Sequence, residues 1–317
     1  MLTVLTECDE GLPRDGGILG ALTDCKLRVG DAAEAGFDWL QDNLAGVFDA
    51  MSAGLEIMID AILALLQEPP NTGWFQDLGR SEVMYLYPEA LHPIVMTLLF
   101  AFIAWWVHRD WKLPAMVGVG LIFIINQGYW EETTESLTLV LSACVVCMGL
   151  GVPIGIAAAH RPRLYAGMRP VLDLMQTLPT FVYLIPAIVF FGIGMVPGLI
   201  ATVIFVLPAP IRLTHLGISS TPKALMEAAD AFGATPRQKL WKVELPYALP
   251  QIMAGLNQTI MLSLSMVVIA ALVGADGLGV PVVRALNQVN TGLGFEAGLM
   301  IVVVAILLDR LLRVRAR

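Results

Sequence analysis

Long apolar runs separated by short polar stretches are the most regular feature of the chain. A transmembrane helix needs roughly 17 to 25 predominantly apolar residues to cross a hydrocarbon layer about 30 Å thick. Seven runs match or approach this length, namely 91–107, 113–129, 137–159, 178–194, 196–213, 252–273 and about 293–312. The pattern predicts an all-α, polytopic membrane protein with about seven transmembrane helices.

Basic residues predict how these spans are oriented, because Lys and Arg remain on the cytoplasmic side of short loops. If the spans alternate, 14 of the 19 basic residues fall on one side, in the loops after the first, third and fifth runs and in the C-terminal tail. The opposite side receives Glu131, Glu132, Glu135 and Asp276 with a lone Arg284. We therefore expect the N-terminus outside and the C-terminus inside.

The N-terminal part of the chain differs in charge from the rest. Residues 1–89 hold 16 Asp and Glu against four Lys and Arg, which argues against nucleic-acid binding. We expect 1–36 to be an acidic external leader, in which Cys8 and Cys25 could pair. Apolar residues recur every three or four positions over 37–68, a pattern typical of an amphipathic interfacial or scaffold helix. Two N-terminal transmembrane helices, 91–130, follow.

The composition excludes several classes of protein. Apolar residues make up 57% of the 317 positions and charged residues 15%, with a mean hydropathy of +0.73, whereas soluble domains carry roughly 25% charged residues. The sequence contains no GxxxxGK[ST] phosphate loop and no HExxH or GxSxG motif. Cys144 and Cys147 lie within an apolar span, so we predict neither metal nor redox chemistry there. Catalysis by this chain alone is not expected.

A polar segment at 221–250 interrupts the apolar pattern and lies on the predicted cytoplasmic side. Thr221-Pro222 predicts a helix start, Gly233 can end that helix, and Thr235-Pro236 starts another. We expect Leu245-Pro246 to end the second helix. The segment is therefore predicted to form two short helices that meet at a corner, a shape suited to docking a soluble protein.

These residues resemble the EAA loop of permease subunits in binding-protein-dependent ABC importers. The pattern is Glu-Ala-Ala, a glycine four positions after the second alanine, and a Leu-Pro further on. The resemblance implies an ATPase-coupling loop within 214–250 and an importer core of five helices within 136–312. The implied coupling residues are Glu227, Ala228, Ala229, Asp230, Phe232, Gly233, Leu245 and Pro246.

Longer stretches resemble the glycine betaine/proline betaine permeases. They are LDLMQTLPTFVYLIPAIVFFGIG from Leu172, VPGLIATVIFVLPAPIRLTHLGI from Val196, IMAGLNQTIMLSLSMVVIAALVGADGLG from Ile252 and FEAGLMIVVVAILLDR from Phe295. This likeness implies a multi-pass protein of the bacterial inner membrane that forms a homodimer. It also implies a cytoplasmic ATPase dimer, which binds ATP and Mg, and an external substrate-binding protein. No cofactor is expected in this chain itself.

Polar residues at membrane depth are candidates for the translocation path, because burying them is costly unless they pair or line a cavity. We predict that Asn257 and Ser265 share a helix face. Hydrogen bonding between helices is an equally good explanation for such residues. Tyr183 lies beside a proline break, and its ring suits a quaternary ammonium group. The candidate path residues are Tyr183, Asn257, Gln258, Thr259, Ser263 and Ser265.

Two alternatives remain open. The first is a related importer permease for another small solute, such as choline, carnitine or an amino acid, since the external protein sets much of the specificity. The second is a secondary transporter driven by an ion gradient. That mechanism favours a pair of acidic residues buried in mid-span, whereas Glu296 and Asp276 lie near predicted span ends.

Overall fold

The computed structural model describes residues 6–8, 25–27, 29–68 and 91–312, and it divides into two units, 1–52 and 53–317. In the first unit, strands β1 (Thr6–Cys8) and β2 (Cys25–Leu27) pair antiparallel, with Cys8 directly opposite Cys25. The all-α prediction therefore misses one small sheet. Most of the predicted acidic leader lies outside the described residues.

Helix α2 (Val29–Gln67) begins in the first unit and ends in the second. It starts before the predicted amphipathic segment, which we placed from residue 37. Its last turns are held by polar contacts within the second unit. The Leu66 carbonyl lies 3.0 Å from Nε2 of His92, and Nε2 of Gln67 donates to the Thr134 hydroxyl at 2.8 Å.

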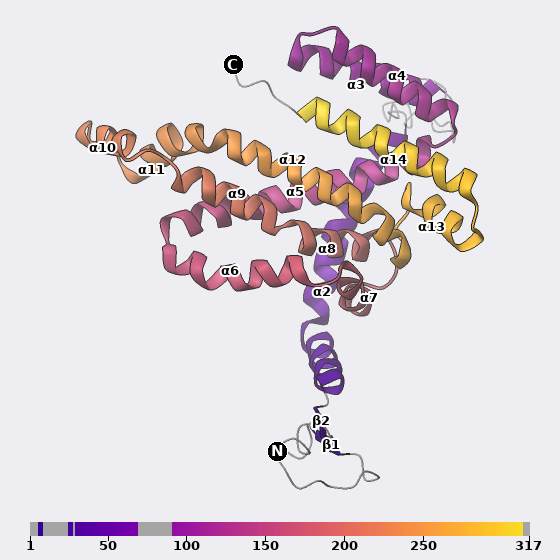
Figure 1. Ribbon diagram of the computed structural model, residues 1–317, viewed down its shortest axis with the longest axis horizontal. Coiled ribbons are helices and arrows are strands. Elements are labelled where there is room, and N and C mark those ends of the chain that lie inside the picture. The colour runs from indigo at the N-terminus through magenta and orange to yellow at the C-terminus, as the bar shows by residue number, and fades with distance from the viewer. Residues whose placement is uncertain (1–5, 9–24, 28, 69–90, 313–317) are drawn as a thin grey trace, which may run out of the picture. The chain divides into compact units, whose positions relative to one another are not determined.

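The second unit continues with helices and short helical turns only, as far as the chain is described (Figure 1). They are α3 (His92–His108), α4 (Lys112–Asn126), α5 (Trp130–His160), α6 (Pro162–Thr177), η4 (Thr180–Tyr183), α7 (Leu184–Phe191), α8 (Met195–Val206), α9 (Pro208–Ser219), α10 (Lys223–Ala231), α11 (Pro236–Lys239), η5 (Leu240–Glu244), α12 (Leu245–Ala270), η6 (Ala271–Val273), α13 (Gly279–Gln288) and α14 (Thr291–Leu312).

Four helical stretches in the described part are long and apolar enough to cross a membrane. They are Trp130–His160, Met195–Ser219, Pro236–Val273 and Thr291–Leu311. The predicted run 178–194 is not a straight span. It is the second arm of a pair, Pro162–Thr177 and Thr180–Phe191, bent by 104°. The bend follows from Pro179, because a residue that precedes proline is driven out of the helical region, and Leu178 has the extended angles φ −65° and ψ 138°.

Two further predicted spans, α3 and α4, are apolar but have only 17 and 15 residues. Helices α6 and α13 were not predicted, since both lie in stretches interpreted as loops. In α6 the carboxylate of Asp173 pairs with Arg212 of α9 at 2.6 Å.

Small residues bring α5, α9 and α12 close together. A methyl group on Gly155 of α5 would lie 2.7 Å from the Ile211 carbonyl oxygen and 2.7 Å from Cβ of Thr214, both in α9. Gly217 of α9 meets Ala248 of α12 in a similar way. Membrane helices approach at small residues because lipid supplies no hydrophobic force between them. These three helices thus form the centre of the second unit.

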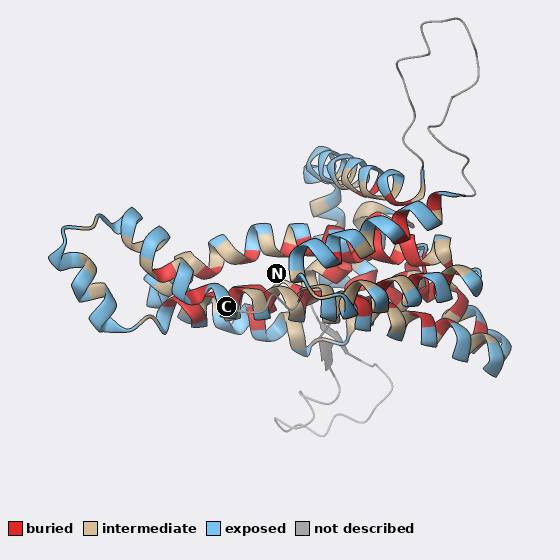
Figure 2. Ribbon diagram, turned by 90° about the horizontal axis from the view of Figure 1, so that it is seen from above, coloured by how far each residue is buried: buried red, intermediate tan, exposed pale blue. Residues whose placement is uncertain are grey.

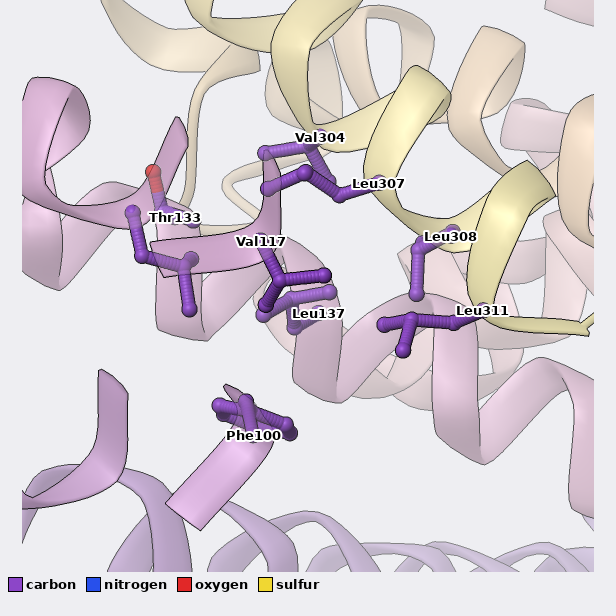
Figure 3. A pocket seen from close by; sticks show the side chains of 9 residues that line it. Phe100, Val117, Thr133, Leu137, Val304, Leu307, Leu308 and Leu311 are labelled. Carbon is purple, nitrogen blue, oxygen red and sulfur yellow. The ribbon is translucent and has the colours of Figure 1, made fainter. Parts of the chain in front are cut away.

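A small apolar cavity of about 40 Å³ lies between α3, α4, α5 and α14. Figure 3 shows the side chains around it. Thr133 is the single polar residue of the lining, and its fully buried hydroxyl has no hydrogen-bond partner among the residues that the structure describes. The lining residues are Phe100, Val117, Leu121, Thr133, Leu137, Val304, Leu307, Leu308 and Leu311.

Candidate functional site

The α10–α11 segment (Lys223–Lys239) extends beyond the ends of α9 and α12, at the opposite end of the second unit from α7 and α13 (Figure 1). Neither α10 nor α11 contains a buried residue. In Figure 2 this end is exposed or intermediate throughout, whereas buried residues follow the packed helices. The segment therefore makes few contacts within its own chain.

The start of α10 differs from the prediction by one position. Pro222, not Thr221, is the N-cap, with the extended angles φ −58° and ψ 133°. The Pro222 carbonyl accepts the first helical bond, from the Leu225 amide at 3.0 Å. Thr221 cannot cap the helix from one residue further out, and its buried hydroxyl has no partner.

One face of α10 exposes apolar side chains. Phe232 is 92% exposed and Leu225 is 45% exposed, and seven residues correspond to about two turns, so they lie on the same side. Ala228 lies between them, and Glu227 is exposed beside it. An apolar face on an otherwise polar, projecting helix is a typical surface for fitting into a groove of another protein.

Gly233 ends α10, as the sequence predicts. Its φ of +73° is in the left-handed region that glycine adopts without strain. The Ala234 amide donates to the Ala229 carbonyl at 3.0 Å, and the Gly233 amide donates to the Asp230 carbonyl at 2.9 Å. These two bonds form a Schellman motif, which satisfies carbonyls that the helix end would otherwise leave free.

The corner after Gly233 is fixed by further bonds. Helix α11 starts where the Thr235-Pro236 pattern predicts, and Thr235 and Gln238 form a reciprocal capping box there. The Lys239 ammonium pairs with the Asp230 carboxylate at 2.7 Å, which joins the two short helices directly. The α10–α11 segment is therefore a braced corner.

The prediction that Leu245-Pro246 ends the second helix is wrong. The helical run continues from Pro236 to Val273 through η5, which is a π-helical turn. In that turn the Leu245 amide donates to the Leu240 carbonyl, five residues back. A wider turn of this kind gives room for Pro246, whose ring would clash in a regular α-helix and which has no amide to donate. Helix α11 is consequently continuous with α12, whereas α10 is set off from this run by the turn at Gly233.

The candidate path residues of α12 divide between three environments. Gln258 and Ser265 are exposed on one side of the helix, whereas Thr259 and Ser263 are buried. Nδ2 of Asn257 donates to Asp309 of α14 at 3.4 Å. Asn257 and Ser265, which we expected to share a face, lie about 80° apart around the helix, because eight residues separate them.

Tyr183 is buried, and its hydroxyl donates to the Met175 carbonyl at 2.8 Å. This bond ties η4 to the last turn of α6 across the bend. Glu296 is exposed near the start of α14, and Asp276 is exposed in the turn between η6 and α13. Cys144 and Cys147 are buried free thiols in α5, and no cluster of metal-ligating side chains occurs among the described residues.

Sequence reasoning missed one contact at the base of the α10–α11 segment. Nε2 of His160, the last residue of α5, lies 2.9 Å from the buried carboxylate of Glu244 in η5. No motif marks this pair, since the two residues are 84 positions apart in the sequence.

Comparison with known proteins identifies the family. Residues 151–317 match the model for the binding-protein-dependent transport system inner membrane component. The chain belongs to this family. The match includes the α10–α11 segment and α12. The protein is thus an inner-membrane component of a binding-protein-dependent transport system.

Relatives extend the likeness over most of the chain. The glycine betaine transport system permease protein OpuAB of Bacillus subtilis is 43% identical over 90% of this chain and 93% of its own length. The glycine betaine/carnitine transport permease protein GbuB of Listeria monocytogenes is 51% identical over 70% of this chain and 80% of its own length. The glycine betaine/proline betaine transport system permease protein ProW of Escherichia coli is 43% identical over 87% of this chain and 72% of its own length.

Among solved structures, the MetNI methionine ABC transporter in an inward-facing conformation superposes with a TM-score of 0.52. The match covers 62% of this chain and 98% of that chain, at 23% sequence identity. At this identity the likeness supports the permease fold alone. The helical core of the second unit therefore has the fold expected for the family that the sequence match identifies.

Proposed function

We propose that this family member is the permease subunit of an ATP-driven importer for betaine-type osmoprotectants, such as glycine betaine and proline betaine. The observation that carries the proposal is the exposed, braced α10–α11 segment, in a chain whose relatives of nearly equal length are named as glycine betaine permeases. In this function the chain forms the translocation path, and a separate ATPase supplies the energy.

The proposed membrane arrangement has seven spans. They are α3, α4, the bent pair and the four long helices, with the N-terminus outside and the C-terminus inside. The distribution of basic residues supports this orientation, because it puts the α10–α11 segment in the cytoplasm together with Arg161, Arg163 and Arg310. The core then spans 136–312 and the coupling loop 214–250, preceded by the leader (1–36), the scaffold helix (37–68) and two N-terminal spans (91–130).

The proposed assembly contains a second copy of this chain, two cytoplasmic ATPase subunits and an external substrate-binding protein. The exposed face of α10, with Phe232 and Leu225, is suited to a groove in the ATPase. ATP-driven closure of the ATPase dimer would move α10 as a rigid body. The corner braced by Asp230 and Lys239 would pass that motion from α10 to α11, and the unbroken helical run from Pro236 to Val273 would carry it to α12.

For the translocation path we propose the exposed side of α12 with Gln258 and Ser265. The Ser265 hydroxyl donates to the Met261 carbonyl of the same helix at 3.1 Å. Thr259 and Ser263 then support this face from behind, and Asn257 holds α14 in place. Tyr183 contributes by fixing the bend between α6 and η4.

Uptake of radiolabelled solutes tests the substrate class. Proteoliposomes holding the permease, its ATPase and its binding protein should accumulate glycine betaine only when ATP is enclosed. Choline, carnitine and an amino acid serve as competitors, because GbuB is named for both glycine betaine and carnitine. Accumulation of choline but not betaine would overturn the assignment of substrate. Accumulation without ATP, driven by a sodium or proton gradient, would overturn the importer mechanism.

A further inference from the structure

The contact between His160 and Glu244 lies where the α10–α11 segment joins the membrane helices. Glu244 is 5% exposed and is the one Asp, Glu, Lys or Arg that is buried in the described part of the chain. It occupies the last position of η5, and His160 is the last residue of α5. The pair therefore joins the base of the segment to a helix other than α12.

The surroundings of Glu244 are apolar, whereas the His160 side chain is 46% exposed. Buried Ile218, Ala248 and Ile252 pack with Met148, Val152, Ile156, Ala159, Leu240 and Leu245 at the ends of α5, α9 and α12. Burying a carboxylate in such a place costs several kcal/mol unless a partner and hydrogen bonds offset it, and an apolar residue is often as stable or more stable there. Packing alone thus gives no reason for an acidic side chain at position 244.

The contacts of both ring nitrogens fix the orientation of the His160 side chain. Nδ1 lies 2.9 Å from the Ile156 carbonyl, and a carbonyl has no proton to give, so Nδ1–H is the donor. Nε2 then faces Glu244 Oε2 at 2.9 Å. The ring is held from both sides, by its own helix and by the carboxylate, so it cannot rotate without breaking one of the bonds.

We propose that His160 and Glu244 are positioning residues that couple movement of the α10–α11 segment to α5. When the ATPase moves the segment, Glu244 would pull the end of α5 through the imidazole ring while the unbroken helix moves α12. Two core helices then respond together. This inference rests on the proposed function, since it needs an ATPase that acts on α10.

The test compares three variants in the full complex in proteoliposomes. Glu244→Met removes the carboxylate and retains an apolar side chain of similar length. Glu244→Gln retains a bond, because its amide can donate to Nε2 of a His160 whose proton is on Nδ1. Asp173→Asn, in the exposed pair of Asp173 with Arg212, is the matched control, since exposed ion pairs contribute about 0–1 kcal/mol.

Three quantities are measured for each complex: betaine taken up per ATP hydrolysed, the ATPase retained on purification, and the midpoint of thermal unfolding. For Glu244→Met we expect uptake per ATP to fall roughly fivefold, the size of effect that loss of one contacting pair typically gives. ATPase retention and thermal midpoint should remain at or above wild type. Glu244→Gln should restore most of the uptake, and Asp173→Asn should match wild type.

The outcomes separate the explanations. Wild-type uptake per ATP in Glu244→Met would overturn the inference and leave the proposed function standing. A lower thermal midpoint or loss of ATPase together with the fall in uptake would also overturn it, because the pair would then serve folding or docking. A wild-type complex without ATP-driven uptake would overturn the proposed function and this inference with it. The double variant His160→Leu/Glu244→Met should behave like Glu244→Met alone.

Discussion

Replacing Phe232 by alanine tests the docking of α10 most directly. The side chain is 92% exposed in this chain, so nearly all of its apolar surface is available to a partner. Full burial of a Phe side chain stabilises a complex by roughly 1.5–3 kcal/mol. Since 1.4 kcal/mol corresponds to a tenfold change in affinity, Phe232→Ala should weaken ATPase binding by about tenfold to a hundredfold.

The assay is a titration of the permease in lipid nanodiscs with purified ATPase subunit, followed by ATP-dependent betaine uptake by the same variants. Phe102→Ala is the matched control, because Phe102 is 59% exposed on α3, which we assign to the lipid-facing part of the molecule. Its removal should leave the Kd for the ATPase unchanged. Both variants should retain the wild-type unfolding midpoint.

An unchanged Kd for Phe232→Ala would refute the reasoning, because it would mean that the exposed face of α10 does not enter the interface. An equally large loss of ATPase affinity in Phe102→Ala would also refute the reasoning, because it would show that the assay responds to nonspecific damage to the permease. If Phe232→Ala weakened betaine uptake but left ATPase binding normal, Phe232 would serve to transmit the ATPase motion and not to bind the ATPase.

Four more substitutions test the corner and the core. Gly233→Pro should leave insertion intact but abolish ATP-coupled uptake, because proline cannot adopt the φ of +73° that turns the chain; wild-type uptake would contradict this. Thr133→Val should raise the thermal midpoint, because the buried Thr133 hydroxyl has no partner among the described residues and its desolvation costs about 1–3 kcal/mol. The control Thr134→Val should lower the midpoint, because it removes the 2.8 Å hydrogen bonds of the Thr134 hydroxyl with Gln67 and with the Glu131 carbonyl. Gly279→Ala should lower the yield of folded protein, because the new methyl group would overlap the carbonyl oxygen of Val267, and a normal yield would show that α13 can move aside.

Local chemistry made part of this molecule predictable. The left-handed Gly233 and the Thr235 capping box depend on residues within a few positions of each other, so the turn follows from the sequence alone. Four of the seven apolar runs likewise correspond to helices long enough to cross a membrane, because the bilayer thickness fixes the length of such a run. Two predictions of this kind failed, at Thr221 and at Pro246, because a proline shifted the helix start in one case and induced a π turn in the other.

Contacts between distant residues were decided only in the tertiary structure. His160 and Glu244 carry no motif, and their pairing depends on how α5 and η5 pack. From the sequence, pore lining and hydrogen bonding between helices explained Asn257 equally well. The packing of α14 places Asp309 beside it, which favours the hydrogen bond. The sequence by itself determined the membrane class, the corner between two short helices and the family resemblance, since these depend on composition and short-range spacing. The partners of buried polar side chains depend on the packing of whole helices, which no local pattern encodes.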